Sequence, residues 1–213
     1  MAEQRQEFQR DLDLIEAQVV RLFGLVSGDL PGATYALVSG RDEALAVLAD
    51  HERAIDTVYR EIENLASQEI LLQAPVASDL RFLVSVLRIA PELERSHDLV
   101  MQIASRANRD LSQELSPRSR GLVERMGDLA ADMWRQAADS WRLRDRSAGP
   151  VLSEQDGAMG RLHSDLIAEL ASGRIALPVA MQMTLVAHFY RRLGGHAVNV
   201  TRRVAYLAGS ASR

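Results

Sequence analysis

The 213-residue chain is predicted to be an all-α protein built from six long helices. In segment 42–69, apolar residues recur every three or four positions and charged residues fill the positions between them, as expected of a helix with one buried face. Only 5% of the residues are aromatic, and the strict alternation that marks strands is hard to find. Glycine and proline interrupt the periodic segments at intervals typical of helix lengths.

These interruptions divide the chain into its elements. The predicted helices are, in chain order, about 5–38, 42–70, 76–107, 117–146, 151–172 and 177–208. The breaks between them contain Gly40, Pro75, Pro117, Gly149, Pro150, Gly173 and Pro178. Ser39, Ser116 and Ser153 lie near predicted helix starts, where a hydroxyl can cap the first turn. Pro91 lies inside the third helix and is expected to kink it, because proline lacks the backbone N–H.

The second set of three helices repeats the pattern of the first. When Glu94 is aligned with Arg191, Asp98 falls on Gly195 and Ile103 falls on Val200, so apolar positions correspond while acidic ones do not. We therefore predict two tandem repeats, 1–111 and 112–213, each an antiparallel three-helix bundle. Three helices are the fewest that bury one another's apolar stripes in this way.

Composition restricts the classes of function. The net charge of −4 gives no electrostatic case for nucleic-acid binding. The chain has no cysteine, which excludes disulfides and thiol chemistry, and a cytoplasmic location is the simplest expectation. The charged N-terminal segment is unlike a secretory signal, and no apolar run reaches the roughly 18 residues of a membrane span.

Two pairs of carboxylates suggest a metal site. Glu94 and Asp98 are four residues apart on the third helix, and Glu52 and Asp56 have the same spacing on the second. With a short loop at Pro75 the two helices run antiparallel, and the two pairs then lie at a similar height. Asp79 is a fifth acid, near the start of the third helix. Such oxygen-rich clusters suit Mg²⁺, Ca²⁺, Mn²⁺ or iron.

A simpler interpretation competes with the metal site. Glu52 and Glu94 are each followed by an arginine, so both could form surface ion pairs of little energetic value. His97 with Glu94 gives the E-x-x-H spacing of di-iron proteins, but those proteins need the spacing on two helices. We find one convincing instance, so His97 is predicted to be a neighbour of the site rather than a ligand.

The segment 73–104, "QAPVASDLRFLVSVLRIAPELERSHDLVMQIA", resembles the PhoU family of phosphate-signalling proteins. It matches the family pattern P-x-A-x-D-L-R followed by L-E-R-x-x-D. The matching residues are Pro75, Ala77, Asp79, Leu80, Arg81, Leu93, Glu94, Arg95 and Asp98. The upstream "DHERAIDTVYREIE" and the closing "GGHAVNVTRRVAYLAG" resemble the family as well, so the resemblance covers nearly the whole chain.

The resemblance implies a fold, a role and partners. PhoU-like proteins are two tandem three-helix bundles, and several bind divalent or iron-type metal ions through E/D-x-x-x-D motifs. The implied ligands at the first repeat are Glu52, Asp56, Asp79, Glu94 and Asp98. The implied role is that of a negative regulator rather than an enzyme. It would contact the ATPase subunit of the phosphate ABC transporter and a sensor histidine kinase, at the inner face of the membrane. A second copy of the chain is a further candidate partner.

The second repeat departs from the family pattern. Asp156 is kept, but Gly160 replaces the acid four residues later, and Arg191 and Gly195 replace the expected Glu and Asp. We favour drift after loss of a metal site. The alternative is that Arg191 binds an anion or pairs with Asp156.

Two other functions remain open at this stage. One is a carboxylate-bridged metal enzyme or metal-storage protein, which the missing second E-x-x-H disfavours. The other is a helical partner protein without metal. No Ser-His-Asp set, phosphate-gripping glycine loop or reactive cysteine is evident in the sequence.

Overall fold

The computed structural model describes residues 2–107, 109–173 and 175–208, and in these ranges the regular structure is helical throughout. The elements are α1 (Ala2–Ser39), α2 (Leu45–Gln73), α3 (Ala77–Ala104), α4 (Arg109–Glu114), α5 (Pro117–Leu143), α6 (Ala148–Leu170) and α7 (Leu177–Ala208). The all-α prediction is confirmed. The prediction of six helices is wrong by one, because the six-residue α4 is too short to show an apolar period.

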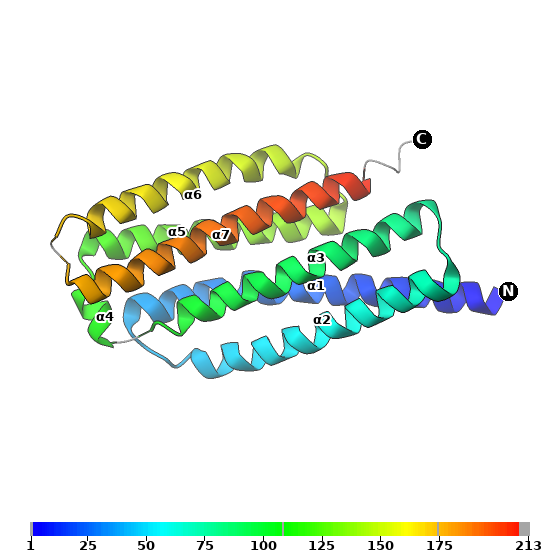
Figure 1. The fold of residues 1–213 in the computed structure, drawn as a ribbon, viewed down its shortest axis with the longest axis horizontal. Helices are drawn as coiled ribbons and strands as arrows, with labels where there is room; N and C mark the ends of the chain where they lie inside the picture. The colour runs from blue at the N-terminus through cyan, green and yellow to red at the C-terminus, as the bar shows by residue number, and fades with distance from the viewer. Residues whose placement is uncertain (1, 108, 174, 209–213) are drawn as a thin grey trace.

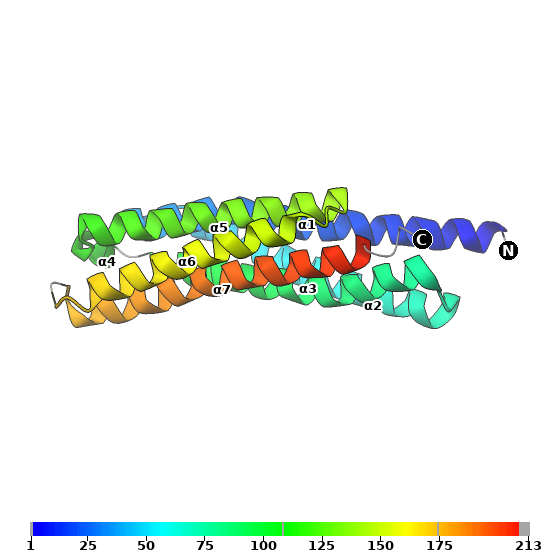
Figure 2. The same cartoon turned by 90° about the horizontal axis from the view of Figure 1, so that it is seen from above.

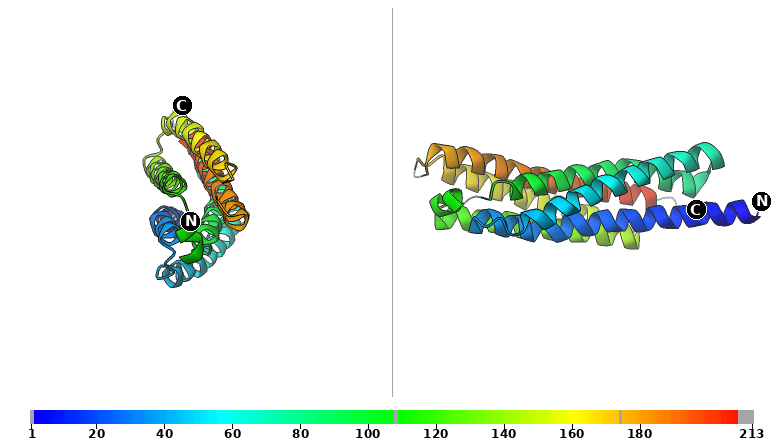
Figure 3. Two further views of the ribbon diagram at one scale, coloured as in Figure 1. Left: turned by 90° about the vertical axis from the view of Figure 1, so that its left-hand side faces the viewer. Right: turned by 90° about the horizontal axis from the view of Figure 1, so that it is seen from below.

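The six long helices run along one axis and give the molecule an elongated shape (Figures 1 and 2). Helices α1, α2 and α3 contact one another and form what we call the first bundle, and α5, α6 and α7 form the second bundle. The bundles lie side by side, with α1 packed on α5 and α3 packed on α7 (Figure 3). The repeat boundary predicted between residues 111 and 112 lies inside α4, which joins the bundles.

One hydrophobic core extends through both bundles. The ring of Phe23 in α1 lies 6.3 Å from that of Trp134 and 6.3 Å from that of Trp141, both in α5. Trp141 also lies 6.0 Å from Phe82 of α3. The two tryptophan side chains are fully buried, and a pair of aromatic rings contributes about 1 kcal/mol beyond its burial. These contacts hold the two bundles in a fixed relation.

The opposite end of the α1–α5 interface depends on a glycine. Thr34 of α1 shares a 2.8 Å hydrogen bond with the Tyr190 hydroxyl of α7, and both groups are buried. A Cβ on Gly127 of α5 would lie 2.3 Å from Thr34 Oγ1, so only glycine allows this approach. Burial raises the pKa of Tyr190 far above its usual value, so the phenol stays neutral and keeps this hydrogen bond.

One of the three serines predicted to cap a helix does so. Ser116 caps α5, because its Oγ accepts the Ser119 N–H at 3.0 Å, as predicted. Ser39 and Ser153 do not cap helices: Ser39 ends α1, and Ser153 lies within α6. Helix α3 continues through Pro91. None of the described helices combines the length and the apolarity that a membrane crossing requires.

Candidate functional site

The acidic face predicted on the first bundle is formed in part. Helices α2 and α3 lie side by side and antiparallel (Figure 1), and they bring Asp56 near Glu94 and Asp98. Burial raises the pKa of Glu94, and the charges of Asp98 and Asp56 raise it further. Burial and Asp56 likewise raise the pKa of Asp98, against an opposing effect of His97. These three carboxyl groups therefore lie close enough to repel one another when ionised.

Glu52 lies one turn further along the same face. It lines a surface cavity of about 450 Å³ together with Asp98, Met101 and Gln102. Asp79 is elsewhere: it lies in the first turn of α3, fifteen residues before Glu94, which is about 22 Å along the helix. There it lines a different cavity, beside Gln9 and Phe82. The structure thus brings together four of the five predicted ligands and separates Asp79 from them.

The arginines that follow the two glutamates form their ion pairs with other acids. Arg53 pairs with Asp50, and Arg95 pairs with Glu92 at 3.2 Å. Neither Glu52 nor Glu94 makes an ion pair in the part of the chain that the structure describes. The charge of Arg95 lowers the pKa of Glu94, but burial and the neighbouring acids outweigh this effect. The simple surface-pair interpretation therefore does not account for these acids.

The acidic face fits a metal ion in the type of its donors but not in their arrangement. Carboxylate oxygens are the ligands that hard cations prefer. Glu52, Glu94 and Asp98 make no ion pair among the described residues, whereas Asp56 lies 3.9 Å from Arg60. Within residues 2–107, 109–173 and 175–208, however, no three aspartate, glutamate or histidine side chains converge on one point as a bound metal requires.

A buried His–Asp–His network lies behind this face, and the sequence analysis did not find it. Asp29 of α1 is 8% exposed, and its carboxylate accepts hydrogen bonds from His97 Nε2 of α3 and His51 Nδ1 of α2, each at 2.9 Å. An ionised carboxylate can only accept, so both ring nitrogens donate. The network joins all three helices of the first bundle. His97 takes part through Nε2, while its buried Nδ1 has no hydrogen-bond partner among the described residues.

One signal in the sequence could have revealed this network. Asp29 interrupts the apolar stripe of α1, three residues after Val26 and four before Ala33, both of which are buried. A charged residue at such a position is buried only when it is paired. Its partners lie 22 and 68 residues away, and sequence spacing does not indicate them.

The second bundle has an ion pair at the corresponding position. The guanidinium of Arg191 in α7 donates to Oδ1 of Asp156 in α6. Gly194 leaves space for this pair, because a Cβ there would lie 2.9 Å from Asp156 Oδ1. A Cβ on Gly160 would lie 3.7 Å from Arg191 Nε, which is an ordinary contact. Of the alternatives left open above, the structure shows the pairing with Asp156. At this position the guanidinium of Arg191 therefore neutralises Asp156.

A polar contact joins the bundles between α3 and α7. His196 Nδ1 lies 2.9 Å from Ser96 Oγ and 3.6 Å from Glu92 Oε2. Burial lowers the pKa of His196; Glu92 opposes this shift, and Arg192 and Arg95 add to it. The imidazole is therefore neutral at physiological pH.

Comparison with known proteins places this arrangement in a family. The model of the PhoU domain matches residues 19–107 and 123–204, on either side of α4. The phosphate-specific transport system accessory protein PhoU homolog 2 of Mycobacterium tuberculosis is 31% identical over 97% of this chain and 99% of its own length. Homolog 1 of Mycobacterium leprae is 31% identical over 96% of this chain and 93% of its own.

Solved structures agree in fold. The crystal structure of PhoU from Pseudomonas aeruginosa superimposes with a TM-score of 0.86 at 24% identity, covering 94% of this chain and 98% of that one. The regulatory protein PhoU from Streptococcus pneumoniae gives a TM-score of 0.80 at 23% identity, covering 94% and 96%. With two matched domains and relatives aligned along their whole length, this chain belongs to the PhoU family.

Proposed function

We propose that this protein is a regulatory adaptor of phosphate uptake, which represses the phosphate-starvation response while phosphate is plentiful. The observation that carries the proposal is the alignment along 99% of a relative named as an accessory protein of phosphate-specific transport. The same match covers 97% of this chain. The proposal assigns no catalytic activity to the protein.

The proposed partners are the ATPase subunit of a phosphate ABC transporter and a sensor histidine kinase, met at the cytoplasmic side of the membrane. The elongated pair of bundles offers two long faces, and this shape suits a protein that contacts two others at once. A second copy of the chain is a further proposed partner.

Binding to the transporter gives a direct test. The purified ATPase subunit of the native cell's phosphate transporter, immobilised, should retain this protein at micromolar concentration. The ATPase subunit of an unrelated ABC transporter from the same cell should not. Equal retention by both subunits, or by neither, would remove the contact from the proposal.

We also propose that the acidic face of the first bundle binds a divalent or iron-type metal ion. The ligands would be Glu52, Asp56, Glu94 and Asp98, after small changes of side-chain rotamer. Support comes from the raised pKa of both Glu94 and Asp98 and from the lack of an ion pair at Glu52 and Glu94. Asp79 is left out of this proposal because of its distance along α3.

Thermal unfolding tests the metal. The melting temperature should rise on addition of Mg²⁺, Mn²⁺, Zn²⁺ or Fe²⁺ and fall again with chelator, since a ligand that binds the native state raises stability. The double variant Glu94→Ala, Asp98→Ala should lose this response. The matched control is Glu124→Ala, Asp128→Ala, an exposed pair of the same residues and spacing on α5. A melting temperature indifferent to all four ions would contradict the proposal.

No observation favours the alternative of a carboxylate-bridged metal enzyme or storage protein. A di-iron carboxylate site takes a Glu from each of two helices and an E-x-x-H motif from each of two others. In the described part of the second bundle, the corresponding acid, Asp156, is already paired with Arg191.

A further inference from the structure

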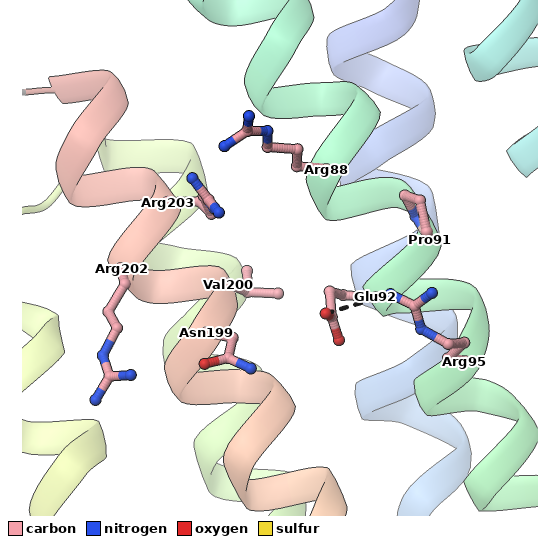
Figure 4. Close-up of a pocket in the computed structure, with 8 residues that line it drawn as sticks. All are labelled: Arg88, Pro91, Glu92, Arg95, Asn199, Val200, Arg202 and Arg203. Carbon is pink, nitrogen blue, oxygen red and sulfur yellow. Dashed lines mark ion pairs between the residues drawn. The ribbon is translucent and has the colours of Figure 1, made fainter.

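A surface cavity of about 680 Å³ lies between α3 and α7, at the junction of the two bundles. Arginines dominate its lining, with two from each helix (Figure 4). They are Arg88 and Arg95 of α3 and Arg202 and Arg203 of α7. The chain contains no lysine, and all 25 of its basic residues are arginines.

The helix register sets these arginines at two levels. Arg88 and Arg95 are seven residues apart, so they lie on one face of α3, about 10 Å from each other along the axis. The contact between Ser96 and His196 fixes the register of the antiparallel α7. It places Arg203 across from Arg88, and in Figure 4 both side chains extend into the space between the helices.

The positive charge of the cavity is largely uncompensated. Among the described residues, Arg88, Arg202 and Arg203 make no ion pair. The acid in the lining is Glu92, whose Oε1 lies 3.2 Å from Arg95 and whose Oε2 lies 3.6 Å from His196. Glu92 thus uses one oxygen on Arg95, while its buried Oε2 accepts no hydrogen bond among the described residues, and Arg88 and Arg203 extend toward the cavity without a paired carboxylate. Charges of one sign around a concave surface produce a strong local potential.

We propose that this cavity binds a small phosphate compound with at least two phosphoryl groups. The guanidinium fork donates two parallel hydrogen bonds to an oxyanion, which makes arginine well suited to phosphate. Arg88 and Arg203 lie at one level, and Arg95, which pairs with Glu92, lies about 10 Å further along α3, so two or more linked phosphoryl groups can approach both levels better than one. The volume falls in the range of small-molecule sites, and the Asn199 amide adds a neutral donor.

The inference does not rest on the proposed function. Binding is a property of the purified chain, and a failure to contact the transporter would leave the cavity and its charges unchanged. Conversely, a regulator of phosphate uptake could work without this site. The two proposals can therefore fail separately.

Isothermal titration of the full chain with pyrophosphate is the test. Pyrophosphate should bind more tightly than orthophosphate, and its affinity should fall steeply with added salt because the contacts are ionic. Arg88→Gln and Arg203→Gln should each weaken binding about tenfold, the loss expected for one charge-assisted hydrogen bond. Glu92→Gln, which removes the negative charge, should strengthen it.

The control variant is Arg125→Gln, which removes an exposed arginine of α5 that does not line the cavity. It should bind pyrophosphate as the wild type does, and circular dichroism should show every variant fully helical. If Arg125→Gln weakens binding as much as Arg88→Gln, the effect is one of net charge, and the proposal is wrong.

Further ligands identify the source of the phosphoryl groups. ADP binding more tightly than pyrophosphate would support the site and assign it to a nucleotide; the reverse order would support it and assign it to an inorganic compound. Equal affinity for citrate would overturn the claim of phosphate chemistry. Tighter binding of an oligoglutamate peptide would overturn it in favour of an acidic protein segment. If titration with pyrophosphate at low salt releases or absorbs no heat, the proposed binding site is wrong.

Discussion

At the scale of single residues, the carboxylates of Glu94 and Asp98 repel each other and Asp56 when ionised. Both carboxyl groups have a raised pKa, caused first by burial and then by neighbouring acids. The folded protein therefore holds protons on them at a pH where the unfolded chain has released them. Stability is consequently lost as the pH rises from the ordinary values of 4.5 and 3.8 through the raised folded values.

Glu94→Gln should therefore stabilise the metal-free protein at pH 7 by a few tenths of a kcal/mol. The gain should shrink as the pH falls toward 4.5, because the wild-type carboxyl group is then protonated as well. Urea unfolding in the presence of chelator at pH 7 and pH 5 measures both values. A destabilised variant at pH 7 would show that the glutamate makes a favourable contact in the absence of metal.

Asp29 has the opposite role, since its charge is satisfied by two histidines. Asp29→Ala should cost about 1–3 kcal/mol of unfolding free energy, because it leaves the buried Nε2–H of His97 without an acceptor. His51→Gln should cost less, because His51 is partly exposed and water can replace its contact. Denaturant unfolding of the two variants gives the comparison. Equal costs would mean that the buried half of the network is no more important than the exposed half.

At the scale of the helices, apolar periodicity predicted the long elements because each buries one stripe over several turns. It missed α4, whose six residues are fewer than two turns. It also missed the acceptor role of Asp29 and the arginine cavity. Periodicity identifies the buried face of a helix, but not the helix that covers it, and both features depend on which helices meet. Asp56, Glu94 and Asp98 were found because a short loop fixes how α2 and α3 pair.

Two adjacent glycines in α7 provide a prediction with an internal control. Gly194→Ala places a Cβ 2.9 Å from Asp156 Oδ1 and should destabilise the protein by about 1–3 kcal/mol as the Arg191 pair is displaced. Gly195→Ala meets nothing within 4 Å and should stabilise the helix by up to about 1 kcal/mol. Thermal melts of both variants suffice. Opposite signs are expected, and a stabilised Gly194→Ala would show that the pair adjusts freely.

The α3–α7 contact should make the joint between the bundles sensitive to acid. Because the pKa of His196 is lowered in the folded protein, the unfolded chain takes up the proton first as the pH falls below 6.5. The contribution of neutral His196 to the free energy of unfolding is therefore fully present above pH 6.5 and is lost as the pH falls below that value. His196→Gln should flatten the dependence of unfolding free energy on pH between 6.5 and 5, measured against wild type. An unchanged slope would assign that dependence to other groups.

At the scale of the whole molecule, the two bundles share a fold and one core but differ in their charges. In the described part of the first bundle, Glu52, Glu94 and Asp98 make no ion pair, whereas in the second bundle Arg191 pairs with Asp156. The cavity between α3 and α7 gathers four arginines and one acid. The fold itself was predictable, because the apolar periodicity of each segment indicates a helix and its buried face. The side-by-side packing of the bundles was not, because contacts such as Phe23 with Trp134 join positions more than a hundred residues apart.

The central claim, regulation of phosphate uptake, is tested most directly in the native cell. The measurement is the rate of phosphate uptake and the expression of phosphate-starvation genes, at high phosphate, in a strain that lacks this protein. We expect both to rise above the parent's levels and to return when the wild-type chain is supplied from a plasmid. A strain whose uptake and starvation genes match the parent's at high and low phosphate would contradict the account.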